Sequence, residues 1–270
     1  MASEPDWVPE GTDTRRANVA RVYDYLLGGT HNFLADQDVA RTMIAVEPRA
    51  REHVRANRDF LGRAVRYLAG LGVHQFLDVG SGIPTQGNVH EIAAQAAPGS
   101  RVVYVDSDPI ATAHSRMLLR DSQTTAVIEA DLREPERILD HDDTRRLIET
   151  SQPTGLILCM VLHFISESED PAGIVARLTA PMAPGSHIVI SHITDDRKPD
   201  VAAALEKVYN RNVTVPGYLR SGADIRTLFG DLELLDPGVV PLPYWRPDPP
   251  GPPDYADQLW SVLCGVARKP

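Results

Sequence analysis

Residues 75–84 read QFLDVGSGIP, and this stretch does most to decide the fold. A short apolar run ends in Asp78 and is followed by Gly80 and Gly82, which permit a tight turn that lies close to a ligand. The next segment, GNVHEIAAQAA (87–97), has the apolar spacing of a helix. A strand, a glycine turn and a helix in this order are typical of nucleotide-type sites in doubly wound α/β sheets.

Further strand-like runs follow and alternate with helical segments. The apolar runs are RVVYVDSD (101–108), TAVIEAD (125–131), GLILCMVLHFI (155–165) and SHIVISHI (186–193). Continuous apolar strands are expected in a parallel sheet that is buried on both faces. Two closing strands are predicted in LELLDPGVVPLPYW (232–245) and LWSVLCGVARK (259–269), separated by a proline-rich loop.

The chain before this sheet is predicted to be helical. Apolar spacing indicates helices over residues 14–27, 37–46 and 48–68, the first capped by Asp13 or Thr14 and closed by the glycine pair at 28–29. We therefore expect an N-terminal helical cap over residues 1–70. The main domain would cover residues 71–270, with a helical insertion at about 197–230 formed by helices near 199–211 and 222–229. Ser221 is the expected N-cap of the second of these helices.

Composition narrows the classes of function. Hydrophobic residues make up 43% of the 270 positions, which is enough for one sizeable core. The formal net charge of −10 disfavours nonspecific binding to nucleic acid or to an anionic membrane. The first residues lack a secretory signal, and no apolar run is long enough to span a bilayer. The two cysteines lie far apart in the sequence, each inside an apolar run. We expect a cytoplasmic protein with neither a disulfide framework nor a metal site.

Candidate functional side chains lie at the carboxyl ends of successive strands. In a parallel sheet this edge forms the crevice in which ligands bind. A carboxylate at Asp106 can accept both hydroxyls of a ribose, and Asp131 with the backbone of Leu132 can read an adenine edge. His163 follows the fourth strand. The third glycine of a dinucleotide fingerprint would fall at Thr85 and is missing, which argues against an NAD-dependent oxidoreductase.

The run from Asp78 to His163 resembles class I S-adenosylmethionine-dependent methyltransferases. Over nearly its full length the chain is similar to an actinobacterial family of S-adenosyl methyltransferases long catalogued as a domain of unknown function. The motifs that carry this similarity are RVYDYLLGGTHNFLAD (21–36), NRDFLGRAVRYLA (57–69), FLDVGSGIPTQGNVHE (76–91), VVYVDSDPIA (102–111) and VLHFI (161–165). The resemblance implies a Rossmann-like α/β sheet of seven strands, five parallel and the last two an antiparallel hairpin.

The resemblance also implies a cofactor, S-adenosylmethionine, and residues that bind it. Asp78 would face the amino group of its methionine part. The other contacts would come from Gly80, Ser81, Gly82, Asp106, Ser107, Asp131, Leu132, Cys159 and Met160. Pro84 departs from the glycine that many class I enzymes keep, which leaves the path of the loop open.

Cap residues and histidines supply further candidates. Tyr25, His31 and Asn32 lie around the Gly28–Gly29 turn and are candidates to line the site, although Tyr25 is equally consistent with a core residue and His31 with a solvated one. His163 is the candidate general base, with a hydrogen-bonded core residue as the competing interpretation, because imidazole titrates near neutral pH. His192, Tyr209 and Tyr218 are weaker candidates.

The predicted function is therefore in-line methyl transfer from S-adenosylmethionine to an unidentified small-molecule acceptor, without a nucleic-acid or membrane partner. The alternative is a regulatory protein that binds S-adenosylmethionine or a nucleotide without catalysis.

Overall fold

The structure is a computed structural model and describes residues 13–84, 87–196, 199–213, 215–248 and 261–270. An eight-stranded sheet in the order β3-β2-β1-β4-β5-β8-β6 forms its centre, with β7 also paired to β8. Five neighbouring strands are parallel, and β8 runs antiparallel to β5. The strands are β1 Gln75–Val79, β2 Arg101–Asp106, β3 Thr125–Glu129, β4 Gly155–Cys159, β5 His187–Ile193, β6 Glu233–Leu234, β7 Val240–Pro241 and β8 Val262–Arg268.

The predicted Rossmann-like α/β architecture is confirmed, but the predicted strand count is wrong by one. The strand expected over residues 232–245 is divided into β6 and β7, which pair with different parts of β8. Between them the backbone N–H of Gly238 donates to the carbonyl of Leu235 at 2.8 Å and closes a turn. Pro237 has no N–H to give to a ladder, so the chain leaves the sheet at this point.

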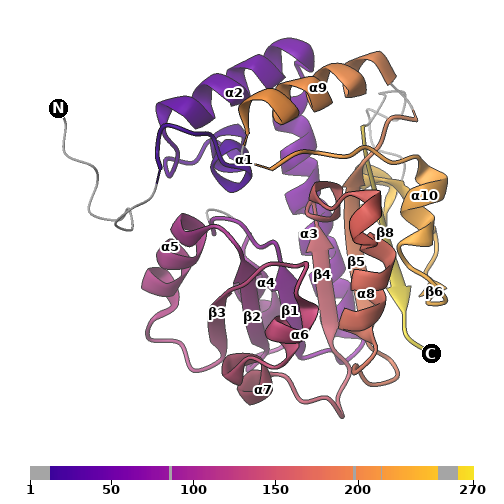
Figure 1. The fold of residues 1–270 in the computed structure, drawn as a ribbon. Coiled ribbons are helices and arrows are strands. Elements are labelled where there is room, and N and C mark those ends of the chain that lie inside the picture. The colour runs from indigo at the N-terminus through magenta and orange to yellow at the C-terminus, as the bar shows by residue number, and fades with distance from the viewer. Residues whose placement is uncertain (1–12, 85–86, 197–198, 214, 249–260) are drawn as a thin grey trace.

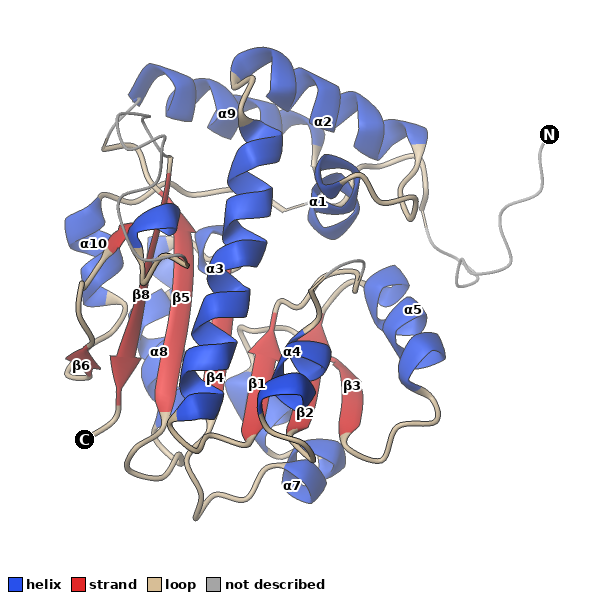
Figure 2. Ribbon diagram, turned by 180° about the vertical axis from the view of Figure 1, so that it is seen from behind, coloured by secondary structure: helices blue, strands red, loops and turns tan. Residues whose placement is uncertain are grey.

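Helices cover both faces of the sheet, and this explains why its strands are apolar throughout (Figures 1 and 2). Successive residues point to opposite faces, so Phe76 packs in the core with α3 and α4 whereas Leu77 packs in the core with the helices of the other face. The first layer is α3 Ala50–Gly70 and α4 Val89–Ala96. The second is α6 Pro135–Leu139, α7 Asp142–Leu147, α8 Pro171–Thr179 and α10 Gly222–Thr227.

A cap of helices lies over the carboxyl ends of the parallel strands (Figure 1). It contains α1 Val19–Leu27 and α2 Leu34–Val46, joined by α9 Pro199–Asn212 from the insertion. All three contribute to one apolar cluster. The long helix α3 starts in the cap and runs down one face of the sheet (Figure 2), where it buries Phe60, Leu61, Ala64, Val65 and Leu68. The cap is thus fixed to the sheet by a continuous helix.

Local signals explain where the cap helices begin and end. Helix α1 begins four or five residues later than expected, because its N-cap is Asn18 rather than Asp13 or Thr14. Oδ1 of Asn18 accepts from the N–H of Ala20 at 2.8 Å. It ends at Gly28, whose φ of 90° is the left-handed conformation predicted for a C-cap glycine. In the insertion, the predicted cap Ser221 accepts from the N–H of Asp224 and is confirmed.

Within the described part of the chain, every helix is too short or too polar to cross a membrane.

Candidate functional site

A cavity of about 1090 Å³, including its open mouth, lies between the carboxyl ends of β1–β4 and the cap. Its floor is formed by the loops that follow the four strands, and its walls by α1, α3 and the chain at the end of α9. This is the crevice in which open α/β sheets bind ligands.

The glycine turn after β1 forms the central part of the floor. Gly80 and Gly82 have φ values of 77° and 66°, which L side chains rarely adopt. The N–H groups of Gly80 and Ser81 donate to the carbonyl of Val105 in β2 at 2.8 and 3.2 Å. A Cβ atom at Gly80 would lie 2.4 Å from Cγ2 of Val161, in the loop after β4. Glycine is therefore required here both for conformation and for space.

Replacing Gly80 with alanine should push the loop after β4 away from the cavity and weaken ligand binding at least tenfold. The matched control is Gly99→Ala, because Gly99 has a φ of 85° but a Cβ atom at this position would meet no other atom within 4 Å. Both variants incur the same conformational penalty, of about 1 kcal/mol. Calorimetric titration with S-adenosylhomocysteine would separate them, and equal losses in the two variants would contradict the steric explanation.

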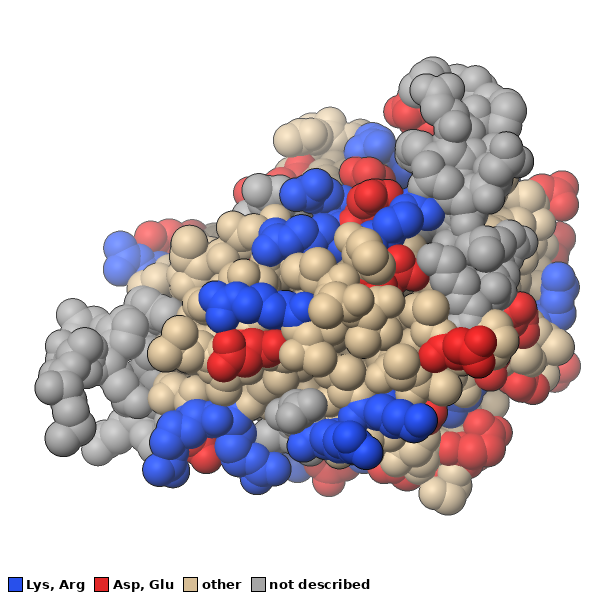
Figure 3. Space-filling model, turned by 90° about the horizontal axis from the view of Figure 1, so that it is seen from above, with Lys and Arg blue, Asp and Glu red and all other residues tan. Residues whose placement is uncertain are grey.

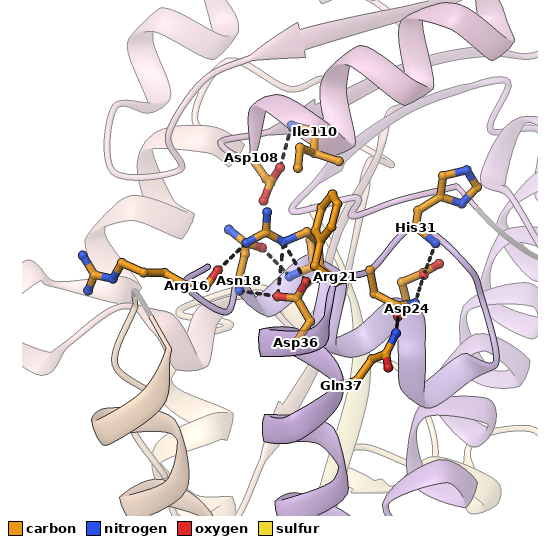
Figure 4. Close-up of polar contacts among 12 residues, drawn as sticks. Arg16, Asn18, Arg21, Asp24, His31, Asp36, Gln37, Asp108 and Ile110 are labelled. Atoms are coloured by element: carbon orange, nitrogen blue, oxygen red, sulfur yellow. Dashed lines mark hydrogen bonds and ion pairs between the residues drawn. The ribbon is translucent and has the colours of Figure 1, made fainter. Parts of the chain in front are cut away.

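Asp106 ends β2 with its carboxylate held in a fixed position. Oδ2 accepts from the N–H of Gly82 at 2.7 Å, and Oδ1 accepts from the N–H of Asp108 at 2.9 Å. Burial raises the pKa of Asp106 to about 6, although these backbone hydrogen bonds lower it. Asp106 therefore links the glycine turn to the start of α5 (Pro109–Leu119), where Asp108 caps the helix (Figure 4).

Asp78 and Arg58 form an incompletely paired couple of opposite charge. Asp78 is 5% exposed, and its carboxylate accepts no hydrogen bond from any described residue. Burial raises its pKa to about 7, with Asp106 adding to the rise and the charge of Arg58 opposing it. The guanidinium of Arg58, from α3, lies over the ring of Tyr23 at 5.5 Å, and its Nε is enclosed without a partner among the described residues. A zwitterionic ligand would satisfy both the carboxylate and the guanidinium nitrogen.

A chain of hydrogen bonds connects the end of β4 to the cap. The N–H of Met160, a residue with a φ of 54°, donates to Oγ of Ser191 at 3.0 Å. Ser191 donates to Oδ1 of Asn57 at 2.6 Å, and Nδ2 of Asn57 donates to the hydroxyl of Tyr23 at 2.9 Å. The chain ends where Tyr23 donates to the carbonyl of Val54. This network holds Met160 in a conformation that is uncommon outside glycine, at the edge of the cavity.

Asp131 and its neighbours form the end of the cavity at β3. Oδ1 of Asp131 accepts from the N–H of Arg133 at 2.9 Å and from its Nη1 at 3.2 Å. The guanidinium of Arg133 also pairs with Glu169 and donates to the carbonyl of Phe164 at 2.9 Å. Arg133 thus ties the end of β3 to the loop after β4. Oδ2 of Asp131 accepts only one long hydrogen bond, of 3.4 Å from Nη1 of Arg133, and keeps a lone pair for a ligand.

The two histidine candidates differ sharply. His163 lines the cavity, and its imidazole has no hydrogen bond to any described residue. Its pKa is lowered well below the usual value by burial, by His192 and by Arg220. His192 is fully buried away from the cavity, with Nδ1 bonded to the carbonyl of Ile193 at 2.7 Å and Nε2 accepting from Arg220 at 2.9 Å. Only His163 is placed to meet a ligand.

The structure brings most of the predicted residues to this one cavity. Those that line it are Asp78, Gly80, Ser81, Gly82, Asp106, Ser107, Asp131, Leu132, Cys159, Met160 and His163, joined by Tyr209 from the insertion. Tyr218 is not among the lining residues. Burial raises the pKa of the Cys159 thiol to about 12, so this thiol is not a nucleophile.

Tyr25 and Asn32 do not line the cavity, contrary to expectation. The ring of Tyr25 lies under the guanidinium groups of Arg41 and Arg51, at 5.9 and 5.1 Å. Two positions along a helix turn the side chain by about 200°, so α1 presents Tyr23 to the cavity instead. Nδ2 of Asn32 donates to Asp24 at 2.8 Å and to the carbonyl of Gly29 at 3.0 Å.

His31 likewise belongs to the structure of the cap. Its backbone N–H donates to Asp24 at 2.8 Å (Figure 4), and its ring lies 3.9 Å from that of His114 in α5. The same close-up shows Arg21 paired with Asp36, which joins α1 to α2. The polar residues around the glycine pair thus stabilise the cap.

Sequence reasoning missed several lining residues, among them Tyr23, Asn57 and Arg58. Asn57 and Arg58 open the motif NRDFLGRAVRYLA (57–69), one of those that carry the family resemblance. A signal was present, because Asn57 falls on the buried face of an amphipathic helix, where an amide needs a specific partner.

Among the described residues, no three His, Cys, Asp or Glu side chains are grouped so that they could hold a metal ion.

Comparisons with known proteins agree with this geometry. The sequence model of a family described as S-adenosyl methyltransferase matches residues 5–270. The chain is similar to the crystal structure of a "putative methyltransferase" from Thermobifida fusca YX, with 40% identity, a TM-score of 0.91, and coverage of 98% of this chain and 99% of the other. A DUF574 family protein from Streptomyces avermitilis MA-4680 matches with 39% identity, a TM-score of 0.89, and coverage of 96% and 99%. None of the curated proteins compared with the chain matches it significantly.

These likenesses extend over almost the whole chain and include the cap as well as the sheet. The family match implies S-adenosylmethionine as the cofactor. The chain belongs to the S-adenosyl methyltransferase family, and S-adenosylmethionine-dependent methyl transfer is its activity.

Proposed function

We propose that the chain methylates a small molecule held in the cavity beside S-adenosylmethionine, and that the couple of Asp78 and Arg58 binds the amino-acid end of this cofactor. The observation that carries the assignment is this pair of opposite charges, with a buried carboxylate and an enclosed guanidinium Nε that lack hydrogen-bond partners among the described residues. The ammonium group of the cofactor suits Asp78, and its carboxylate suits Arg58. A neutral or dianionic ligand would leave one of the two charges uncompensated.

The remaining contacts follow the order of the strands. The backbone of the turn from Gly80 to Gly82 would surround the methionine part, and Asp106 with Ser107 would bind the ribose hydroxyls. Asp131 and the backbone of Leu132 would bind adenine. Cys159 and Met160 would add backbone contacts at the methionine end. The spacing of neighbouring strands, near 4.8 Å, spreads these contacts along an extended ligand.

Chemically, the bound cofactor supplies a methyl group made electrophilic by its sulfonium charge. The residues of the chain orient the two reactants and keep water out, because an in-line displacement depends mainly on proximity and alignment. His163 is the one imidazole among the lining residues of the described chain. It would hold an acceptor and take up its proton where the acceptor has one to lose.

A small acceptor is favoured over nucleic acid by the enclosed site and by the surface charge. Helices of the cap form walls of the cavity, so the acceptor would have to fit between them and the strand ends. Figure 3 views the molecule from the cap side, and its Lys and Arg side chains alternate with Asp and Glu rather than forming one basic surface. The net charge of −10 supports the same conclusion.

The assignment of Asp106 can be tested by binding. Asp106→Ala should weaken binding of S-adenosylhomocysteine by about 1–3 kcal/mol, the scale for losing hydrogen bonds to a charged group. The same variant should bind the 2′,3′-dideoxyribose analogue of this ligand as well as the unmodified protein does. Asp121→Ala, at an exposed position, is the control.

Calorimetric titration compares S-adenosylmethionine, S-adenosylhomocysteine and NAD directly. The proposal expects saturable binding of the two sulfur compounds only. Binding without turnover of any acceptor would favour the alternative of a regulatory protein, and binding of NAD alone would contradict the proposal.

A further inference from the structure

The cavity is lined in part by residues that are not assigned to the cofactor. Since the strand order β3-β2-β1-β4 matches adenine, ribose and methionine in turn, the remaining space lies at the loop after β4, under the cap. Its wall is formed by Tyr23 of α1, Tyr209 of α9, and His163 with Phe164 from the 3-10 turn at Leu162–Phe164.

This wall carries no ionised side chain. Burial raises the pKa values of Tyr23 and Tyr209, so both phenols keep their protons. The lowered pKa of His163 keeps its imidazole neutral at physiological pH. The charged side chains among the described lining residues are Arg58, Asp78, Asp106, Asp131 and Arg133. The first four are assigned to the cofactor, and Arg133 is already paired with Asp131 and Glu169. A charged acceptor would therefore be buried without a counter-charge, which is costly.

The wall is also aromatic. The ring centroids of Phe164 and Tyr209 are 6.0 Å apart, and those of Phe164 and His163 are 4.0 Å apart. Clustered rings with few polar groups favour a planar apolar ligand, which gains edge and face contacts as well as burial.

His163 supplies the polar contact on this side. Its side chain is 3% exposed, lines the cavity, and has an Nδ1 atom that is enclosed without a partner among the described residues. A neutral imidazole accepts a hydrogen bond from a hydroxyl group. An acceptor with an ammonium group would instead meet a sulfonium and the guanidinium of Arg58, both of like charge.

We infer that the methyl acceptor is an uncharged aromatic compound whose hydroxyl group donates a hydrogen bond to His163, an inference that rests on the proposed function. A lone pair of the hydroxyl oxygen forms the bond to the methyl carbon, and the electrons of the carbon–sulfur bond remain on sulfur. The hydroxyl proton passes to the imidazole. One positive charge is lost at sulfur while one is gained by His163, so the net charge of the site is unchanged.

The test uses the full chain saturated with S-adenosylhomocysteine and four probes that share one ring system. These are 2-naphthol, naphthalene, 6-hydroxy-2-naphthoate and 6-(aminomethyl)-2-naphthol, with binding followed by ligand-observed NMR. We expect 2-naphthol to bind at least tenfold more tightly than each of the other three. His163→Leu should remove the preference for 2-naphthol over naphthalene while S-adenosylhomocysteine still binds.

A second pair of variants tests the aromatic wall. Tyr209→Leu should weaken 2-naphthol binding, whereas Tyr218→Leu, the other tyrosine of the insertion, should not. Tightest binding of the carboxylate or amine probe would overturn the inference, as would no binding of any probe to a protein that binds S-adenosylhomocysteine. Failure to bind S-adenosylhomocysteine would overturn the proposed function itself.

Discussion

Asp78→Asn should make the ligand-free protein more stable at pH 8 and should remove most of its affinity for S-adenosylmethionine. Burial raises the pKa of Asp78 in the folded protein to about 7, from 3.8 in an unfolded chain. The folded state therefore binds this proton more tightly, and the stability of the unmodified protein falls as pH rises from about 4 to 7. Asparagine carries no ionisable group, so the variant lacks this loss of stability. One pKa unit corresponds to about 1.4 kcal/mol, so the gain is several kcal/mol at most.

Affinity should change in the opposite direction to stability. Without the carboxylate, the ammonium group of the ligand has no counter-charge, so the dissociation constant should rise by roughly 10- to 100-fold. In the unmodified protein, affinity should fall on acidification below pH 7, because Asp78 then takes up a proton. The asparagine variant should lack this part of the pH dependence.

Thermal unfolding at pH 5 and pH 8, with titration calorimetry at both, measures the two effects. Asp59→Asn, at an exposed position of helix α3, is the control for removing an acidic side chain. A variant that is less stable than the unmodified protein at pH 8 would show that the ligand-free site already compensates the Asp78 charge.

The sequence was sufficient for the parts of the fold that are set by local signals. Apolar runs that alternate with helical segments identified β1 to β5, and the carboxyl ends of these strands brought Asp78, Asp106 and Asp131 to one cavity. This inference needed no side-chain geometry, because parallel strands share an edge. Capping signals such as Ser221 were equally local.

The features that were missed depend on contacts between distant segments. Nothing near α9 indicates that it packs on α1 and α2, because that contact joins residues more than 150 positions apart. The choice of Tyr23 over Tyr25 depends on which face of α1 meets the sheet. Periodicity gives the apolar face of a helix but not the neighbour that covers it. Functional residues in the cap were therefore less predictable than those at strand ends.

Arg58 is the residue whose replacement best separates the proposed binding mode from a structural role. Arg58→Met should weaken S-adenosylhomocysteine binding by roughly 10- to 100-fold, since a hydrogen-bonded charge contributes about 1.5–3 kcal/mol. Methionine retains much of the apolar stem that packs beside Tyr23. Binding of 5′-methylthioadenosine, which lacks the amino-acid end, should remain within a factor of two to three.

The comparison of these two ligands makes the result specific. Arg55→Met, at an exposed position one turn earlier in α3, should change neither affinity. If Arg58→Met weakened both ligands equally, Arg58 would act by supporting the cap rather than by binding a carboxylate. If only S-adenosylhomocysteine were affected, the pKa of Asp78 should also rise in the ligand-free variant, because the charge of Arg58 now lowers it. The affinity loss on acidification would then begin at a higher pH, and this shift would link the two residues as one binding couple.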